Sequence, residues 1–347
     1  MIRFQPMRTI IAFGLTVLLL GGCALWGGGD AGREIDPPPE GANLLPDDEE
    51  VEPTMAAASE QMMDVTLYYK DPNGYVTPVS VEIPYTVSAA RAVLEHMVEG
   101  GPGDALVPEG FTALLPKGTK IQGIDIMNDK LAVVDFSPEF ASYNPQDERK
   151  IMEAVTWALT QYDTIDKVQF WLNGETLTEM PQDGTPMDEP LTRAMGINLE
   201  LGEGIELSRS MPVTLYFQSQ SEAGDTYFVP VTRMVSRSDD AAEAALQELI
   251  RGPISPGLVS VIVPTAKVLN VRHGDDLITV DFNTELLNGE DRASADTLQS
   301  VVLSLTDTTG AEQVMITVDG SVQVVGTDDV AYSEPVGRPR HINKLES

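Results

Sequence analysis

The chain has 347 residues, enough for two ordinary domains or one large one. Apolar residues make up 42 % of it, and 54 acidic side chains against 22 basic ones give a net charge of −32. This charge argues against nucleic-acid binding, because phosphate contacts need clustered lysine and arginine. A basic patch is likewise excluded as the means of holding the chain at an anionic membrane.

Cysteine and histidine are too scarce for most metal and nucleophile chemistry. The single cysteine, Cys23, excludes an intramolecular disulfide, cysteine-based zinc sites and iron–sulfur clusters. Three histidines, His96, His273 and His341, leave little for a transition-metal site or a serine–histidine pair. No cofactor or metal ion is therefore expected.

Residues 1–22 have the pattern of an export signal. Arg3 and Arg8 precede an apolar stretch over residues 10–20, which is too short for a typical spanning helix. Gly21-Gly22-Cys23 follows at once and resembles the bacterial lipobox, in which the cysteine thiol receives a diacylglyceryl group and the anchor carries acyl chains such as palmitate. The alternative is an ordinary signal peptide with an unrelated cysteine.

Residues 23–63 are rich in glycine, proline and acidic side chains, as in the run Asp47-Asp48-Glu49-Glu50. Such a composition cannot bury a core and predicts a disordered tether spanning roughly 35 Å. The folded part is then expected outside the cytoplasm, anchored by lipid to the cell membrane.

The rest of the chain is an internal repeat. We call residues 64–200 copy 1 and residues 212–347 copy 2, with a linker over 201–211. The matched segments, in order, are Val65-Thr66-Leu67-Tyr68-Tyr69 with Val213-Thr214-Leu215-Tyr216-Phe217, Gly101-Pro102 with Gly252-Pro253, Leu115-Pro116 with Val263-Pro264, Val134-Asp135-Phe136 with Val280-Asp281-Phe282, and Asn173-Gly174 with Asp319-Gly320.

The end of each copy repeats too. Glu189-Pro190 and Arg193 precede Ile197-Asn198 with the same spacing that relates Glu334-Pro335 and Arg338 to Ile342-Asn343. We call residues 189–198 and 334–343 the arms. Because they recur, each is predicted to pack back on a domain, and the two domains are expected to pack on each other.

Each copy is predicted to be α+β, with the order β-β-α-β-β-α-β and two helices covering one face of a small mixed sheet. In copy 1 the predicted strands are 65–70, 76–84, 120–127, 130–137 and 167–173. Residues 127–129 predict a hairpin turn in which Asn128 or Asp129 has positive φ.

The helix starts and faces are predicted from capping residues and periodicity. Ser88 is expected to cap the first helix, Asp239 its counterpart, and Asn144-Pro145 to open the second helix. The apolar faces expected for the second helices are Ile151, Val155, Leu159 and Tyr162 in copy 1, and Leu298, Val302 and Leu305 in copy 2.

These residues resemble the GerM family of sporulation and germination lipoproteins with two tandem GerMN domains. The resemblance is carried by the repeated Gly-Pro, by Leu115-Pro116-Lys117-Gly118-Thr119-Lys120 and by the hairpin ending at Asp135-Phe136. It implies a fold like the ring-building motif, a role in the envelope apparatus between mother cell and forespore, and no catalytic residues. Copy 2 departs at Pro264-Thr265-Ala266-Lys267, which lacks the Gly-Thr.

The positions kept in both copies are the candidate sites, interpreted as structural or partner-facing. They are Gly101, Pro102, Pro116, Asp135 and Phe136 in copy 1, and Gly252, Pro253, Pro264, Asp281 and Phe282 in copy 2. Asp135 and Asp281 are candidate acids without a predicted partner, so we expect them to accept backbone N–H groups near the turn beyond the strand. The glycines are expected to adopt a left-handed conformation, with proline stopping the helix.

Three functions follow from these observations. The leading hypothesis is a non-catalytic, membrane-anchored lipoprotein that acts as a protein-interaction scaffold in sporulation and germination. The alternative is an extracytoplasmic ligand-binding or sensing lipoprotein, with Trp157 and Trp171 lining a pocket between the domains. A cell-wall enzyme is the third, and it would need catalysis by Asp135.

Overall fold

The structure is a computed structural model, and it describes residues 61–202, 204–287, 292–321 and 324–344. The predicted signal peptide, the lipidation site Cys23 and the tether up to residue 60 lie outside these residues. In the part of the chain that is described, no helix is both long enough and apolar enough to cross a membrane.

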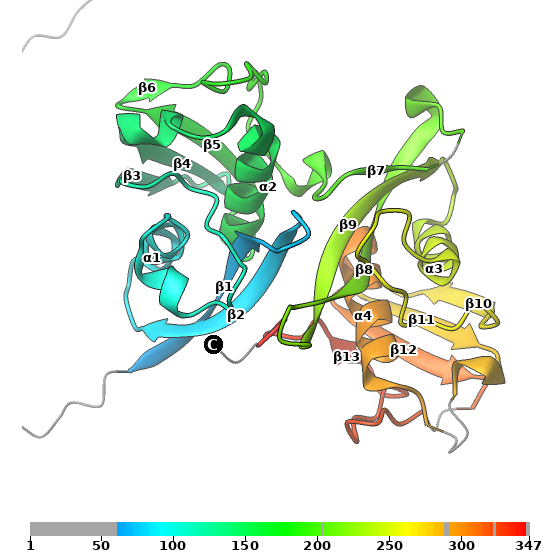
Figure 1. The fold of residues 1–347 in the computed structure, drawn as a ribbon. Helices are drawn as coiled ribbons and strands as arrows, with labels where there is room; N and C mark the ends of the chain where they lie inside the picture. The colour runs from blue at the N-terminus through cyan, green and yellow to red at the C-terminus, as the bar shows by residue number, and fades with distance from the viewer. Residues whose placement is uncertain (1–60, 203, 288–291, 322–323, 345–347) are drawn as a thin grey trace, which may run out of the picture. The chain divides into compact units, whose positions relative to one another are not determined.

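Copy 1 has the predicted order of elements (Figure 1). Its elements are β1 (Met62–Lys70), β2 (Val76–Pro84), α1 (Ala89–His96), β3 (Ile121–Ile126), β4 (Leu131–Phe136), α2 (Glu148–Leu159), β5 (Lys167–Leu172) and β6 (Glu175–Thr176). The first strand starts two residues inside the predicted tether, because Met62 and Met63 continue the antiparallel ladder against β2.

Copy 2 repeats this order. Its elements are β8 (Ser210–Gln220), β9 (Thr226–Ser236), α3 (Ala241–Arg251), β10 (Val268–His273), β11 (Leu277–Phe282), α4 (Ala295–Thr309), β12 (Gln313–Val318) and β13 (Val336–Gly337). The predicted linker contains structure of its own: β7 (Glu200–Leu201) pairs with β9 in parallel, and β8 already begins at Ser210.

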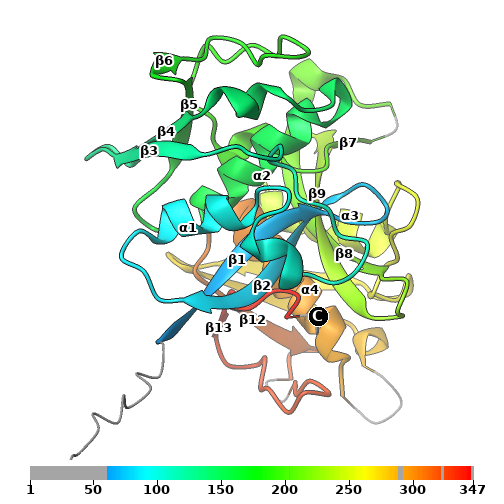
Figure 2. The ribbon, with the colours of Figure 1, turned by 60° about the vertical axis from the view of Figure 1, so that its left-hand side comes forward.

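Each copy is built in three layers, with the two helices between the hairpin and a mixed sheet. Figure 2 shows this arrangement in copy 1, where α1 lies between β3 and the β1–β2 hairpin. In copy 1, α1 contacts both β1 and β3, and α2 contacts both β1 and β5. In copy 2, α3 contacts β8 and β10, and α4 contacts β8 and β12. The helices therefore cover one face of the mixed sheet, as predicted, and the hairpin covers the other side of the helices.

The mixed sheets share the connectivity of their first three strands, but the fourth strands differ: β6 pairs with the end of β5, and β13 pairs with the start of β12. The strand orders are β3-β4-β5-β6 and β10-β11-β12-β13. In each sheet the second helix is the crossover between two parallel strands, β4 and β5 or β11 and β12. The strand before that pair, β3 or β10, is antiparallel and forms an edge.

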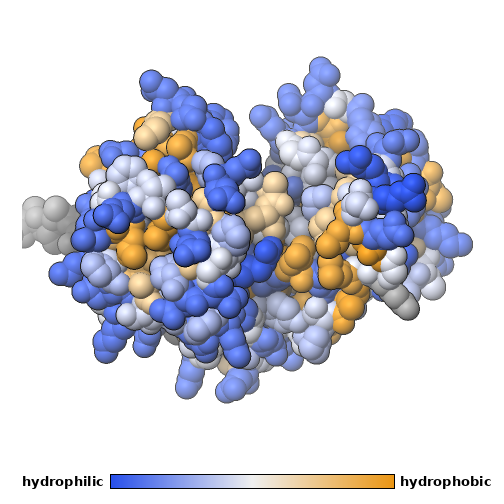
Figure 3. Space-filling view, turned by 90° about the horizontal axis from the view of Figure 1, so that it is seen from above, coloured by the Kyte–Doolittle hydropathy of each residue, from blue (hydrophilic) through white to orange (hydrophobic). Residues whose placement is uncertain are grey.

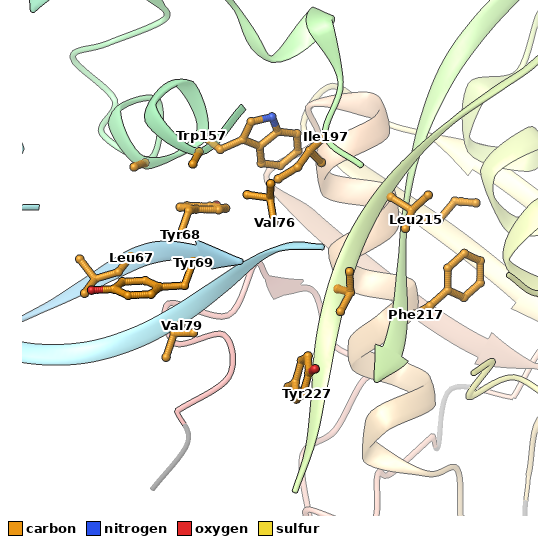
Figure 4. Close-up of a cluster of buried hydrophobic side chains, with 14 of the residues drawn as sticks. Leu67, Tyr68, Tyr69, Val76, Val79, Trp157, Ile197, Leu215, Phe217 and Tyr227 are labelled. Atoms are coloured by element: carbon orange, nitrogen blue, oxygen red, sulfur yellow. The ribbon is translucent and has the colours of Figure 1, made fainter. Parts of the chain in front are cut away.

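The predicted faces of the second helices point into the core. Ile151, Val155 and Leu159 are fully buried, and so are Leu298 and Leu305. Aromatic and aliphatic side chains from both copies continue this core, with Trp157 and Ile197 near β2 and with Leu215 and Phe217 on β8 (Figure 4). One hydrophobic core cluster thus contains residues of both copies.

Two local predictions need correction. Positive φ in the β3–β4 turn falls on Lys130 (60°) and on neither Asn128 nor Asp129, because the turn continues one residue further before β4 pairs. Asp240, and not Asp239, is the N-cap of α3, and its carboxylate accepts the Glu243 N–H at 3.0 Å.

The remaining caps are close to the predictions. Ser88 occupies the N-cap of α1, but its side chain makes no capping bond. Asn144 caps a 3₁₀ turn over Pro145–Asp147, accepting the Gln146 N–H at 3.1 Å, and α2 follows from Glu148.

Candidate functional site

The repeated carboxylates make the same hydrogen bond in both copies. Asp135 Oδ1 accepts the Gly174 N–H at 2.9 Å, and Asp281 Oδ1 accepts the Gly320 N–H at 2.9 Å. Both glycines stand in the turn that follows the neighbouring parallel strand, so each carboxylate ties two strand ends together. Among the described residues, neither carboxylate has a hydrogen bond or ion pair to a second titratable side chain.

The two Gly-Pro segments differ. Gly252 has φ of 92°, as expected, whereas Gly101 is extended at φ −83° and the positive φ falls on Gly100. The prediction for Gly101 is therefore wrong. Glycine is needed there for a different reason: a Cβ on Gly101 would come within 2.7 Å of the Val98 carbonyl oxygen.

Pro116 lines a groove of copy 1 with a volume of about 490 Å³, and Pro102 lies near it in the chain. Pro102 opens a 3₁₀ helix (Pro102–Ala105) that brings Asp104 to the groove, and Pro116 lines it directly. The remaining lining residues are Lys70, Glu99, Phe111, Thr112, Ala113, Leu114, Leu115, Ser142, Tyr143, Asn144 and Asp147.

The matched proline of copy 2 stands in a different turn. In copy 1 the Thr119 N–H donates to the Pro116 carbonyl at 3.1 Å across Gly118, whose φ is 84°. In copy 2 the Ala266 N–H donates to the Val263 carbonyl at 3.0 Å, so Pro264 lies inside a turn without glycine. The departure seen in the sequence is therefore a change of turn geometry.

The aromatic residues after the repeated acids lie in the core. Phe136 and Phe282 are fully buried. The Phe136 ring stacks on Phe140 with centroids 4.2 Å apart and meets Phe170 edge-on at 5.4 Å. Their repetition is explained by packing.

The arms cross between the copies. Ile197, in the arm of copy 1, accepts the Thr232 N–H of β9 at 2.8 Å and donates its own N–H to the Thr232 hydroxyl at 3.0 Å. Ile342, in the arm of copy 2, does the same with Ser80 of β2, at 3.0 and 2.8 Å. Each arm therefore docks on the hairpin of the other copy, which local sequence could not show.

The asparagine after each isoleucine fastens the two hairpins together. Asn198 accepts the Val76 N–H and donates to the carbonyls of Val76 and Pro230, each at 2.8 Å. Asn343 accepts the Phe228 N–H and donates to the carbonyls of Phe228 and Pro78, at 2.7 to 2.8 Å. The two sets are related by an approximate twofold symmetry, the pattern of an isologous dimer interface.

The arm arginines meet at one carboxylate of α4. Arg193 and Arg338 lie 3.3 and 2.6 Å from Asp307 Oδ1, while the Tyr216 hydroxyl donates to Asp307 Oδ2 at 2.6 Å. The Arg193 guanidinium also lies over the Trp157 ring, 4.4 Å from its centroid. A buried charge is thus neutralised by residues of both copies.

A second group of buried charges joins the end of copy 1 to copy 2. The fully buried Arg233 of β9 donates to Glu200 Oε2 at 2.8 and 3.0 Å and to Glu248 Oε2 at 2.9 Å. Glu200 belongs to β7, directly after the arm of copy 1. Sequence analysis missed this triad, because nothing in the neighbourhood of Arg233 marks a buried arginine.

The tip of the β1–β2 hairpin also contacts copy 2. Asp71 Oδ2 accepts the Tyr227 hydroxyl proton at 3.0 Å, and Asn73 Nδ2 donates to the Ser219 hydroxyl at 3.0 Å. Burial raises the pKa of Asp71, against the hydrogen bonds from Tyr75, Tyr227 and the turn amides, which lower it.

The tryptophans predicted to line one pocket are not brought together. Trp157 is 1 % exposed and packs beneath Arg193 and beside Tyr68. Trp171 follows the core residue Phe170 on β5, so strand alternation puts its side chain on the opposite face of the sheet. The two tryptophans therefore do not line one pocket between the copies.

The histidines serve local structure. His96 Nδ1 lies 2.7 Å from the Ala92 carbonyl oxygen within α1, and His273 Nε2 lies 2.9 Å from Asp240 Oδ2. Across the described ranges, no group of three or more histidine, cysteine, aspartate or glutamate side chains is arranged to hold a metal ion.

Glu148 is the most strongly perturbed carboxylate. Burial alone would raise its pKa, but hydrogen bonds from the Asp183 and Thr185 amides and from the Tyr143 hydroxyl hold the pKa at about 2. All of these partners lie in copy 1. The arrangement anchors the loop after β6 and offers no proton donor or acceptor to a substrate.

The surface seen from above is mostly hydrophilic, with apolar patches over both copies (Figure 3). Large apolar side chains that are exposed include Val87, Ile126 and Met127 in copy 1 and Leu201 and Leu207 in the linker. Exposed apolar side chains of this kind are candidates for contacts with other proteins.

Comparison with known proteins agrees with this duplicated architecture. The model of the Germane family, described as sporulation and spore germination, matches residues 66–178 and 214–324, one match in each copy. The chain belongs to this family. The spore germination protein GerM of Bacillus subtilis (strain 168) is 36 % identical over 349 residues, which cover 94 % of this chain and 95 % of that protein.

Solved structures of the Germane family resemble the chain as well. The tandem GerMN domains of the sporulation protein GerM from Bacillus subtilis match with a TM-score of 0.77 and 37 % identity, over 81 % of this chain and 99 % of theirs. The first GerMN domain of the same protein is 44 % identical, with a TM-score of 0.37 over 38 % of this chain and 98 % of its own. The fold is therefore that of tandem GerMN domains, and the homology supports a role in sporulation or germination.

Proposed function

We propose that this chain is a non-catalytic, lipid-anchored protein that acts as an interaction scaffold in the envelope assembly between mother cell and forespore. The exchanged arms are the observation that carries this proposal. Asn198 and Asn343 each bond to both hairpins, so the two copies form one body that presents related but unequal outer surfaces.

The titratable groups of the body support a non-catalytic role. Asp135 and Asp281 are bound to turn amides, and Asp307 is neutralised by Arg193 and Arg338. These side chains are occupied in holding strands and copies together.

Anchoring is proposed from the sequence alone. Cys23 would carry the lipid, and the acidic segment after it would hold the body away from an anionic membrane surface. The scaffold would then act on the extracytoplasmic face, in the intermembrane space of the forespore.

The test is deletion of the gene in the organism that carries it, with spore yield and germination as readouts. We expect deletion to lower the yield of germination-competent spores, the full chain to restore it, and Cys23→Ala to restore it poorly. Normal spores after deletion would contradict the proposal. Release of fragments from purified cell wall by the full chain, lost in Asp135→Asn, would contradict the non-catalytic role.

A further inference from the structure

The free edge of β3 in copy 1 lies beside a groove of about 460 Å³ whose lining is part apolar and part polar. Val87, Ala89 and Ala90 at the start of α1 form one wall, and Ile124 and Ile126 of β3 form another. Tyr162 and Ile165 close the end. Val87 is 91 % exposed and Ile126 is 48 % exposed, so the walls are open to a partner.

The backbone along this groove is unpaired. Met127 donates its N–H to the Leu131 carbonyl at 2.9 Å, and hydrogen-bonded pairs alternate along an antiparallel ladder. Ile124 and Ile126 therefore point their N–H and C=O groups away from β4. No other described strand lies on that side of β3.

Two further features show where the free edge of β3 begins and that a hydroxyl group beside it lacks a hydrogen-bond acceptor. Arg91 donates to the carbonyls of Ile121 and Gln122, which covers the first part of β3 and leaves the second part open. The Tyr162 hydroxyl is buried and has no hydrogen-bond partner among the residues that the structure describes. Burial raises the pKa of Tyr162 to about 12, so the hydroxyl keeps its proton and needs an acceptor.

Copy 2 has the same edge, but there a side-chain contact joins the edge strand to the neighbouring helix. His273 occupies the position of Ile126, and Asp240 occupies that of the helix cap Ser88. The 2.9 Å contact between His273 Nε2 and Asp240 Oδ2 ties the edge strand to the helix. Charged or polar side chains at such positions are a common protection of strand edges.

We propose that the β3 edge of copy 1 binds an extended, apolar segment of another envelope protein that also carries positive charge, by addition of a strand to the sheet. This inference rests on the proposed scaffold function and names its docking surface. Backbone groups of Ile124 and Ile126 would pair with the segment, whose carbonyls would also supply an acceptor near Tyr162.

The acidic side chains around the groove indicate that the segment bound there carries positive charge. Asp125 lines the groove and Asp163 lies next to the lining residue Tyr162, and neither has an ion-pair partner among the described residues. The neighbouring cation, Arg91, is engaged with strand carbonyls. With a net charge of −32, the chain repels a second copy of itself and attracts a cationic segment.

The test uses the full chain in detergent micelles and a labelled peptide that alternates valine or isoleucine with lysine. Matched peptides carry glutamate for lysine, or proline at alternate positions. We expect saturable binding of the lysine peptide by fluorescence anisotropy, and slower hydrogen exchange at Ile124 and Ile126. Binding should weaken at least tenfold with the glutamate or proline peptide; equal binding of all three would overturn the inference.

Two variants locate the binding site. Ile124→Pro removes an N–H group that points away from β4. Ser88→Asp combined with Ile126→His introduces into copy 1 the His-Asp contact of copy 2. Each variant should weaken peptide binding at least tenfold. Val271→Pro, the matched change at the edge of copy 2, should leave it unchanged. Unchanged binding in the copy 1 variants, with thermal unfolding like that of the original chain, would refute the surface.

Further outcomes would identify a different occupant. If Ile124 and Ile126 are protected without peptide and deletion of residues 24–60 exposes them, the chain's own N-terminal segment fills the groove. Protection that rises with protein concentration would indicate a second copy. Either result overturns the inference.

Spore assays separate this inference from the proposed function. If gene deletion abolishes sporulation but the Ile124→Pro chain restores it fully, the docking surface is wrong and the scaffold stands. If deletion itself leaves sporulation normal, the scaffold function fails, whatever the peptide does.

Discussion

The two copies have matching arm contacts where they face each other, and they differ at their outer strand edges. At the interface, Ile197 and Asn198 of the copy 1 arm bond to the hairpin of copy 2. Ile342 and Asn343 of the copy 2 arm bond to the equivalent positions in the hairpin of copy 1. At the outer strand edge, copy 1 has Ile126 open to solvent where copy 2 has His273 bonded to Asp240. The duplication thus keeps the Ile-Asn pairs that join the copies, whereas the outer strand edge differs between them.

The buried arginine of copy 2 has no counterpart in copy 1, where Val81 takes its position on β2. Replacing Arg233 with alanine should lower the free energy of unfolding by about 3–5 kcal/mol, because Glu200 and Glu248 are left as buried charges without a partner. Urea unfolding measures the loss. As a control, Arg251→Ala removes an exposed partner of the same Glu248 and should lower the free energy of unfolding by under about 1 kcal/mol. Equal losses in the two variants would contradict the interpretation that burial makes Arg233 the stronger partner.

Glu148 in copy 1 has no acidic counterpart in copy 2, where α4 begins at Ala295. Glu148→Gln should cost about 3 kcal/mol at neutral pH, given a pKa of about 2 in the folded chain against 4.5 for the free side chain. Because the folded pKa is the lower one, this stabilisation is complete above pH 4.5 and is lost as the pH falls toward about 2.

Unfolding by urea across that pH range, with the original chain and the glutamine variant, shows the effect. The two curves should converge at low pH. Glu153 on the same helix provides the control, since burial raises its pKa and its change to glutamine should not remove the acid sensitivity. Parallel curves for Glu148→Gln and the original chain would contradict the assignment.

The arm asparagines should behave as a matched pair. Asn198→Ala and Asn343→Ala each remove three hydrogen bonds at the interface, and we expect each to cost about 2 kcal/mol. Hydrogen exchange should rise at Thr232 in the first variant and at Ser80 in the second. A loss confined to the copy that carries the substitution would show that the arms do not cross.

The repeated carboxylates should give the smallest effect. Asp135 has one backbone donor, whereas Asp281 also accepts the Thr317 hydroxyl proton at 2.7 Å. Asp135→Ala should therefore cost about 1 kcal/mol and Asp281→Ala somewhat more, as thermal unfolding would show. Spore formation should be unaffected by Asp135→Asn, and its loss with a stable chain would argue for a catalytic role.

Local sequence patterns predicted much of the fold, because each element depends on nearby residues. Alternating apolar residues indicated the strands, and the Asn173-Gly174 and Asp319-Gly320 pairs do form turns with positive φ. The errors at Asp239 and Gly101 are shifts of one residue, where two adjacent residues of the same type compete for one position. Such choices depend on packing, as the close approach of Gly101 to Val98 illustrates.

The interface was less predictable than the elements. The repeat marked Arg193, Asn198, Arg338 and Asn343 as meaningful, but spacing carries no information about which copy an arm reaches. Arg233 gave no signal, since a buried arginine is recognised only by its partners. The difference between the two outer strand edges is seen only in the structure, where the strand registers place Ile126 and His273 at equivalent positions of the two sheets.

The exchange of arms is tested most directly by cutting the chain between the copies. A specific protease site inserted after Gly204 separates copy 1 and its arm from copy 2, and size-exclusion chromatography follows the products. The account predicts that the halves co-elute after cleavage, and that they separate when Asn198→Ala and Asn343→Ala are combined. Separate elution of the halves from the otherwise unchanged chain would contradict the exchanged-arm interface.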